Sequence, residues 1–422
     1  MLQFLKQILN NAQYKRILDN IVSLFGLQGF SYILPLITFP YLTRILGPDK
    51  YGLIAFALAF IGYFQILTDY GFNLSATREV SIYRDDDEKI SNIYSSVMVS
   101  KFLLMLLSLT IMTVVVFSFD KFRSDWLLYF FTFGLVLGNL LLPTWFFQGM
   151  EKMRYISILN ILIGVIYTVA IFIFVRSPED YLYVPLINSI GTIVIGFWSL
   201  GLVHRQFNVE FITPSMDDIK YQMKEGWHLF LSTLAISLYT TSNRFILGLF
   251  VSNTIVGYYS VAETIVRALQ GLISPISQAI YPYFSKLQLE NRSKAKIQLK
   301  KLLIFIGVFS FLISIVLLFC APVIVQLLAG GEYSESIPLL QILVFVVFAV
   351  GVNNILGIQG LVAFGYKEKF STIVIIAGVI HLLLLIGLIV LLGSWGAAIA
   401  VVITEVIICI MEYIVLRRLK IL

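Results

Sequence analysis

The sequence predicts an all-α polytopic membrane protein with twelve transmembrane helices in two six-helix lobes related by a pseudo-twofold axis. Composition is the first observation behind this prediction: 59% of the residues are hydrophobic and 13% are charged, with a mean hydropathy of +0.91. A soluble globular domain carries about 25% charged residues. Apolar stretches long enough to span a bilayer recur along the whole chain, and polar motifs of the first half recur in the second.

Twelve segments approach or exceed the roughly 20 residues that a helix needs to cross a bilayer. They are residues 21–43, 51–72, 95–118, 127–148, 156–175, 183–203, 228–250, 256–284, 302–328, 337–364, 371–392 and 396–416. Proline or clustered glycine interrupts several of them, and neighbouring membrane helices can satisfy the backbone groups that such residues free. We therefore expect kinked spans at these places.

The loops between the spans predict the orientation of the chain. Twenty-two of the 30 Lys and Arg residues lie in the termini and the even-numbered loops, and five lie in the odd-numbered loops. The positive-inside rule therefore places both termini in the cytoplasm. The net charge of +6 is then a topology signal and requires no nucleic-acid partner.

Residues 1–20 are expected to form a cytoplasmic lead-in helix. They lack a continuous apolar run and a small-residue cleavage site, so no cleavable signal peptide is predicted. The alternative is an interfacial helix with one apolar stripe, made of Leu2, Leu5, Leu9, Ala12 and Ile17.

An internal repeat predicts the two lobes. The run Arg44–Gly47, followed by Gly52, recurs six spans later as Arg244–Gly248, followed by Gly257. Six is an even number, so the halves share one orientation and are related by an axis along the membrane normal, an arrangement in which transporters bind cargo between halves. The predicted lobes are residues 1–203 and 228–422, joined by a hydrophilic cytoplasmic linker at 204–227.

The sequence contains no recognisable catalytic or metal-binding motif. It lacks HExxH, CxxC, GxSxG and Walker A patterns, and its three histidines are scattered. Cys320 and Cys409 both lie in spans, which excludes a disulfide framework. The outward loops are too short to form a soluble domain. We therefore expect no enzyme, no metal and no cofactor, and a transport process driven by a proton or sodium gradient, the membrane potential or the cargo gradient.

Charged side chains inside the spans form the candidate site, because a guanidinium at the bilayer centre costs about 2.5–3.5 kcal/mol on insertion scales. At a rise of 1.5 Å per residue, Arg244 and Glu263 each lie roughly 10 Å from the outer ends of their spans, so they can pair. Arg267 lies roughly 17 Å deep on the face of Glu263, and such a pair would leave it uncompensated beside a cavity. The alternative is a structural network of all three side chains.

Other intramembrane charges are weaker candidates. Lys101 lies about 10 Å from the cytoplasmic side of span 3, where it can instead snorkel, and Asp69 can instead be interfacial. His381 and Glu405 lie roughly 14–15 Å deep on adjacent helices, where they can relay a proton or bind a coupling ion. A lone histidine on an apolar helix is more often a packing residue.

Four stretches carry a family resemblance that covers essentially the whole chain. They are residues 44–52 (RILGPDKYG), 69–79 (DYGFNLSATRE), 145–153 (WFFQGMEKM) and 257–271 (GYYSVAETIVRALQG). In this order they resemble the Wzx-type flippases of lipid-linked oligosaccharides, which move O-antigen and other polysaccharide repeat units. Those flippases belong to the multidrug/oligosaccharidyl-lipid/polysaccharide exporter superfamily.

The resemblance implies a flippase in the bacterial cytoplasmic (inner) membrane. Its cargo is an undecaprenyl-pyrophosphate-linked oligosaccharide repeat unit, moved from the cytoplasmic to the outer leaflet by alternating access for O-antigen or capsule biosynthesis. The planar fork of arginine suits pyrophosphate. The expected contacts are therefore Arg267 and Arg244, with Glu263 orienting them and Arg44 and Lys101 contributing secondarily.

Further residues are expected to act in gating and ion coupling. Arg78 and Glu79, at the inner end of span 2, are candidates for the cytoplasmic gate. Asp69, His381 and Glu405 are candidates for ion coupling. Besides the polyprenyl-pyrophosphate-linked oligosaccharide, the expected partners are membrane lipids, a polysaccharide polymerase and a chain-length regulator.

Three alternatives remain open at this level. A peptidoglycan lipid-precursor flippase of the same superfamily has the same architecture. A drug/cation antiporter of that superfamily requires an acidic, aromatic pocket, whereas the deepest unmatched charge here is expected to be positive. A membrane-embedded polysaccharide polymerase or ligase belongs to another class and usually requires a large outward loop.

Overall fold

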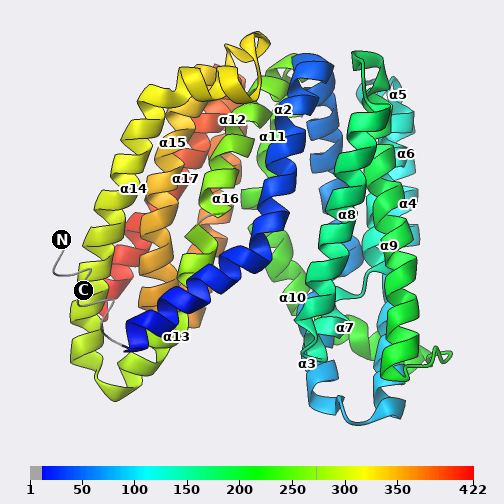
Figure 1. Ribbon diagram of the computed structural model, residues 1–422, viewed down its shortest axis with the longest axis horizontal. Helices are drawn as coiled ribbons and strands as arrows, with labels where there is room; N and C mark the ends of the chain where they lie inside the picture. Colours follow the sequence, from blue (N-terminus) through cyan, green and yellow to red (C-terminus); the bar gives the residue numbers. More distant parts are fainter. Residues whose placement is uncertain (1–11, 272) are drawn as a thin grey trace. The chain divides into compact units, whose positions relative to one another are not determined.

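The computed structural model describes residues 12–271 and 273–422, and within these ranges it contains helices and no strands (Figure 1). Residues 1–11 of the expected lead-in helix lie outside the described residues. The chain divides into two compact units. The N-terminal unit consists of Ile37–Gly248 and Ser252–Gly257. The C-terminal unit consists of Tyr258–Leu422, Leu249–Val251 and the described residues up to Leu36.

The helices follow one another along the chain with short connections. The helices that make up most of the N-terminal unit are α2 (Ala12–Asp69), α3 (Phe72–Tyr83), α4 (Asp87–Ser118), α5 (Asp120–Arg123), α6 (Trp126–Leu141), α7 (Thr144–Gly149), α8 (Met153–Phe174), η1 (Pro178–Leu182), α9 (Tyr183–Phe207), α10 (Met216–Thr240) and α11 (Ser242–Phe250). The remaining helices are α12 (Asn253–Gly271), α13 (Ile273–Glu290), α14 (Arg292–Leu328), η2 (Gly331–Tyr333), α15 (Ser336–Asn353), the π-helix η3 (Asn354–Val362), α16 (Lys367–Leu392) and α17 (Ser394–Arg418).

Nine helical segments of the described chain are long and apolar enough to cross a membrane. The first, Leu34–Tyr83, contains two predicted spans, because α2 leaves the helical conformation at Gly47 (φ 66°, ψ 173°), inside the predicted loop. Two predicted spans are not among the nine. These are 228–250 and 256–284, which correspond to the interrupted and less apolar pairs α10–α11 and α12–α13. The all-α transmembrane fold is confirmed, and the count of twelve requires that both pairs also cross.

Helix starts follow local capping chemistry. The side chain of Asp86 accepts a hydrogen bond from the backbone amide of Lys89 at the start of α4. Ser215 and Asp218 form a capping box at the start of α10, inside the hydrophilic segment 204–227. The hydrogen bond from the Ser215 hydroxyl lowers the pKa of the Asp218 carboxyl. These polar caps mark where segments outside the bilayer turn into helices.

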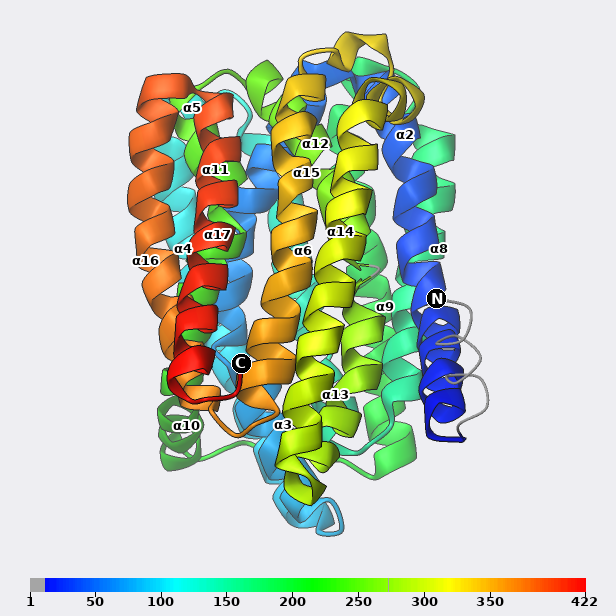
Figure 2. The same ribbon diagram turned by 90° about the vertical axis from the view of Figure 1, so that its left-hand side faces the viewer.

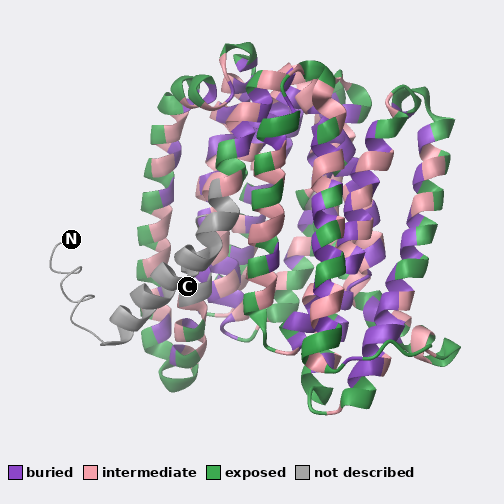
Figure 3. Ribbon diagram, turned by 45° about the vertical axis from the view of Figure 1, so that its right-hand side comes forward, coloured by how far each residue is buried: buried purple, intermediate pink, exposed green. Residues whose placement is uncertain are grey.

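Helix α10 and most of α11 belong to the N-terminal unit. The predicted second lobe begins at residue 228. In the structure, α10 packs against α3 and α4, and Gly71 lies against Leu229 and Phe230. The predicted boundaries at 203 and 228 rest on the repeat and stay a prediction about symmetry. Figure 3 shows where each unit is packed: buried residues line the helix faces that meet neighbouring helices, and exposed residues lie on outer faces and at helix ends.

Two of the four glycines in the internal repeat, Gly52 and Gly257, pack against each other within the N-terminal unit. A Cβ atom added to Gly52 would overlap the carbonyl oxygen of Asn253 and lie 2.5 Å from the amide nitrogen of Gly257. A Cβ atom added to Gly257 would overlap the carbonyl oxygen of Pro48. Residues 253–257 at the start of α12 therefore touch the backbone of α2 directly, which only glycine permits. The repeated glycines have a packing role.

We expect the free energy of unfolding of the Gly52→Ala variant to fall by about 1–3 kcal/mol, because its methyl group must push two backbones apart. A matched control is Gly62→Ala on the same helix, where the added Cβ atom would meet only the Thr241 Cγ2 atom, at 3.7 Å. Thermal unfolding of the detergent-solubilised variants should show a clear drop in midpoint for Gly52→Ala alone. Equal midpoints for the two variants would contradict this account of the contact.

Candidate functional site

An ion pair on α12 places a cation at the surface of the C-terminal unit. Arg267 and Glu263 are four residues apart, so they lie on one helix face, and the Arg267 Nη2 atom is 2.9 Å from the Glu263 Oε1 atom. The Glu263 side chain is 8% exposed, whereas the Arg267 side chain is 47% exposed. The expectation that Arg267 lacks a counter-charge is therefore wrong: a buried carboxylate on its own helix anchors a guanidinium that stays accessible.

Arg244 lies on α11 in the N-terminal unit and is half-buried. Its neighbours in sequence are held firmly. The Tyr63 hydroxyl donates to the Ser242 Oγ atom at 2.8 Å, and the ring of Phe245 stacks on those of Phe56 and Phe60, with centroids 5.6 Å apart in both cases. These contacts determine the side of α11 from which Arg244 projects. Its predicted pairing with Glu263 stays a prediction.

Arg44, the repeat counterpart of Arg244, is exposed on α2, three residues before the break at Gly47. This position agrees with the expected place at the mouth of a span. Its secondary role in cargo binding stays a prediction.

Lys101 is enclosed in the N-terminal unit. Its Nζ atom donates to the Asp69 Oδ1 atom at 2.8 Å, which joins α4 to the end of α2. The Lys101 side chain is 2% exposed and that of Asp69 is 33% exposed, so the lysine does not snorkel. The charge of this enclosed ammonium is balanced within the N-terminal unit, and the secondary role of Lys101 in cargo binding stays a prediction. Asp69 is its structural partner as well as a candidate for ion coupling.

Glu79 connects α3 to α10. The Gln222 Nε2 atom donates to the Glu79 Oε2 atom at 2.7 Å, and the negative charge of Glu79 raises the pKa of the nearby Tyr221 phenol. Arg78, beside it, is exposed. A polar contact of this kind between α3 and α10 can break when a gate opens. The gating role of Arg78 and Glu79 stays a prediction.

His381 and Glu405 contact different partners within the C-terminal unit. The Thr404 hydroxyl donates to the Ala400 carbonyl, so we assign the buried His381 Nδ1 atom, 2.9 Å away, as the donor to that hydroxyl. Glu405 is 5% exposed, and its Oε2 atom accepts from the Asn353 Nδ2 atom at 2.6 Å. Both groups are therefore buried and hydrogen-bonded on adjacent helices.

Glu412 is a buried carboxylate that the sequence analysis did not single out. It is fully buried on α17, seven residues after Glu405, and neither carboxyl oxygen has a hydrogen-bond partner among the described residues. A Cβ atom at Gly357 of the π-helix η3 would overlap its Oε1 atom. The available signal was the spacing: Glu405 and Glu412 are two turns apart in an apolar segment and so share a face. π-Helices are frequent at functional sites.

Among the described residues, no group of three or more His, Cys, Asp or Glu side chains could hold a metal ion. The buried residues His381, Glu405 and Glu412 therefore do not form such a group.

Comparisons with known proteins agree with this architecture. A family model described as Polysaccharide biosynthesis protein matches residues 17–288. The protein named "Putative O-antigen transporter" of Escherichia coli (strain K12) is 34% identical over 403 residues, which are 96% of this chain and 97% of that protein.

Two solved structures have a similar fold. A multidrug resistance MATE family transporter of the MOP superfamily, in an inward-facing conformation, aligns with a TM-score of 0.73 and 15% identity over 92% of this chain and 95% of its own. The lipid II flippase MurJ, in an inward closed conformation, aligns with a TM-score of 0.70 and 15% identity over 93% of this chain and 87% of its own. At such identities the likeness establishes the fold alone.

Proposed function

Because this chain belongs to the polysaccharide biosynthesis protein family, we propose that it is a flippase for undecaprenyl-pyrophosphate-linked oligosaccharide repeat units. The predicted family resemblance is confirmed, and the fold is shared with two solved transporter structures. The protein is a multi-pass membrane protein. We further propose that it lies in the bacterial inner membrane with both termini in the cytoplasm, and that it works by alternating access without catalysing a reaction.

The accessible guanidinium of Arg267 is the observation that carries the proposal. It is anchored on a buried carboxylate within a helix of a membrane protein, and its planar fork of donors matches two oxygens of a phosphate. A pyrophosphate is the densest anion that a lipid-linked sugar offers. Arg244 is proposed as a second contact, with Glu263 as the orienting group and Arg44 as a secondary contributor.

Ion coupling is proposed for Asp69, His381 and Glu405. The latter two are buried, hydrogen-bonded and titratable, and buried ionisable groups in membrane proteins mark ion and proton pathways. The coupled ion is proposed to be a proton or sodium.

A reconstitution assay tests the function. Proteoliposomes carrying a labelled undecaprenyl-pyrophosphate oligosaccharide are probed with a membrane-impermeant reagent that reaches one leaflet only. We expect the accessible fraction to rise faster than in protein-free liposomes. The same assay, run with an imposed pH gradient or sodium gradient, tests ion coupling. A transport rate that neither gradient changes would exclude coupling to protons or sodium.

The alternatives predict different results in that assay. A peptidoglycan-precursor flippase would move lipid-linked peptidoglycan precursor and leave the oligosaccharide lipid in place. A drug/cation antiporter would move an organic cation instead, which the exposed arginine would repel. A polymerase or ligase would change the length of the glycan. Each of these outcomes would overturn the proposed cargo.

A further inference from the structure

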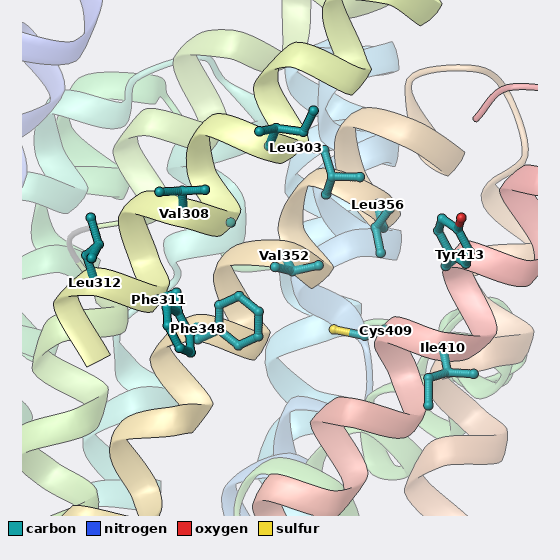
Figure 4. Close-up of a pocket in the computed structure, with 12 residues that line it drawn as sticks. Leu303, Val308, Phe311, Leu312, Phe348, Val352, Leu356, Cys409, Ile410 and Tyr413 are labelled. Carbon is teal, nitrogen blue, oxygen red and sulfur yellow. The ribbon is translucent and has the colours of Figure 1, made fainter. Parts of the chain in front are cut away.

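An apolar groove lies on the membrane-spanning part of the C-terminal unit. It has a volume of about 660 Å³ and is bounded by α14, α15 with the π-helix η3, and α17, which run side by side (Figures 2 and 4). Its walls are almost entirely hydrocarbon, from side chains that include Ile304, Phe311, Val352, Leu356 and Ile410. A space of this size and composition, between helices that cross a membrane, suits a lipid chain.

Cations gather at one end of this groove on two of its walls. On α14, Lys300 and Lys301 come one turn before Leu303 and Ile304, which line the groove. Together with cations at the end of α17 they form the basic cluster, which consists of Lys296, Lys300, Lys301, Arg417, Arg418 and Lys420. Their positions follow from the course of the two helices, because α14 begins and α17 ends at the same end of the groove.

One direct contact joins the α14 side of the basic cluster to the α17 side. The Lys296 Nζ atom donates to the backbone carbonyl of Lys420, which ties the start of α14 to the end of α17. The Arg417 guanidinium lies 5.8 Å from the ring centroid of Tyr413, a residue that lines the groove. No member of the cluster forms an ion pair with an acidic side chain among the described residues. The positive charge therefore remains available to an anion at the mouth of the groove.

We propose that this groove binds an anionic phospholipid, with one hydrocarbon chain in the groove and the phosphate on the basic cluster. Basic pockets between transmembrane helices commonly bind anionic lipid head groups. Complementary charge at one end and an apolar channel along the rest select a molecule with both features. The site is separate from the proposed cargo contacts, since Arg267 lies on α12, which does not line the groove.

The bound lipid supports the polar core of the unit. Val352 and Leu356 face the groove, and their sequence neighbours Asn353 and Gly357 contact Glu405 and Glu412 on α17. A chain in the groove therefore packs against the back of the end of α15 and of the π-helix η3, which together carry these contacts. We expect the lipid to raise the thermal stability of the protein whether or not cargo is present.

Native mass spectrometry of the full-length protein tests the proposal. The purified protein is mixed with phosphatidylglycerol and phosphatidylcholine that carry identical acyl chains. The wild type should retain phosphatidylglycerol preferentially, and added salt should weaken this preference. Equal retention of the two lipids by the wild type would overturn the proposal.

A charge variant tests the head-group site. In the triple variant Lys300→Gln, Lys301→Gln and Arg417→Gln, the preference for phosphatidylglycerol should fall about fivefold per cation removed, while both lipids still bind. The matched control neutralises three exposed cations of the N-terminal unit, Lys152, Arg154 and Arg205, and should keep the preference. Equal losses in the two triple variants would mean that general surface charge, and no built site, selects the lipid.

A groove variant tests the chain site. A Cβ atom at Gly307 would meet only the Val352 Cγ2 atom, at 3.9 Å, so the larger side chain of Gly307→Leu extends into the groove. Retention of both lipids should fall at least tenfold. The control Gly387→Leu, on the exposed face of α16 where nothing lies within 4 Å of an added Cβ atom, should bind as the wild type does. Unchanged binding by Gly307→Leu would exclude the groove.

A competition experiment separates the phospholipid from the cargo carrier. Polyprenyl phosphate is added to the wild type bound to phosphatidylglycerol. Retention of phosphatidylglycerol at equimolar competitor supports the proposal. Its complete displacement would identify the groove as a carrier-lipid site and overturn the proposed occupant, while leaving the flippase assay unaffected.

Discussion

Replacing Arg267 with alanine is expected to lower the initial rate of oligosaccharide-lipid movement roughly tenfold to a hundredfold at subsaturating cargo. Hydrogen bonds to a charged group contribute about 1.5–3 kcal/mol, and Arg267→Ala removes such donors from the proposed pyrophosphate site. Arg267→Lys should give an intermediate rate, because lysine keeps the charge but loses the planar fork. The measurement is the leaflet-accessibility assay in proteoliposomes with matched protein amounts.

Two further variants separate cargo binding from helix stapling. Arg154→Ala removes an exposed arginine far along the chain from the site and should flip at the wild-type rate. Glu263→Gln keeps the shape of the anchor while removing its charge, so it should reduce transport less than Arg267→Ala does. If folded Arg267→Ala protein moves cargo at the wild-type rate, the anion-site proposal is wrong. If the only defect of Arg267→Ala is a lowered unfolding midpoint, and Glu263→Gln shows the same defect, the ion pair has a structural role only.

Replacing Asp69 with asparagine is expected to destabilise the protein by about 3 kcal/mol. Removal of one partner of a buried ion pair typically costs about 3–5 kcal/mol. The lower end applies because the Asp69 side chain is 33% exposed. Asp69→Asn leaves the ammonium of Lys101 enclosed without its counter-charge. The midpoint of thermal unfolding in detergent measures the effect.

Replacing the other partner of the ion pair should have a smaller effect on stability. Lys101→Met should cost less than Asp69→Asn, because the carboxylate that it leaves behind is partly exposed whereas the lysine side chain is only 2% exposed. The double variant should recover most of the loss, since methionine can fill the same space without a charge. A Lys101→Met protein less stable than Asp69→Asn would contradict this account, as would an additive double variant.

Features that depend on composition and local spacing were predictable from the sequence. The helical membrane fold and ten of the spans follow from apolar content and length. The break in the first long helix lies at Gly47, inside the predicted loop 44–50, where glycine adopts a positive φ without strain. The pairing of Arg267 with Glu263 was also available from the i, i+4 rule, although depth arithmetic favoured Arg244 as the partner.

Features that depend on how helices rotate against each other were not predictable in the same way. One expectation for Lys101 was that it snorkels, yet α4 turns it toward Asp69 and away from the surface. The sequence did not indicate a role for Glu412, which is near the end of its span. In the structure, its side chain lies against the π-helix η3 and is fully buried. Depth along a helix follows from residue number, but the direction of a side chain depends on packing partners that lie far away in sequence.

By itself, the sequence determined that this chain resides in a membrane, crosses it repeatedly as helices and carries a small set of costly charges inside. Those properties are sums over local residues, because hydropathy and helical rise need no partner. Only the tertiary structure decided which charges are enclosed, which stay accessible and which lie together. Arg267 is half-exposed and paired with Glu263, and the basic cluster meets an apolar groove because the start of α14 contacts the residues that follow α17. Such relations arise from long-range packing, which positions each side chain through helices distant in the chain.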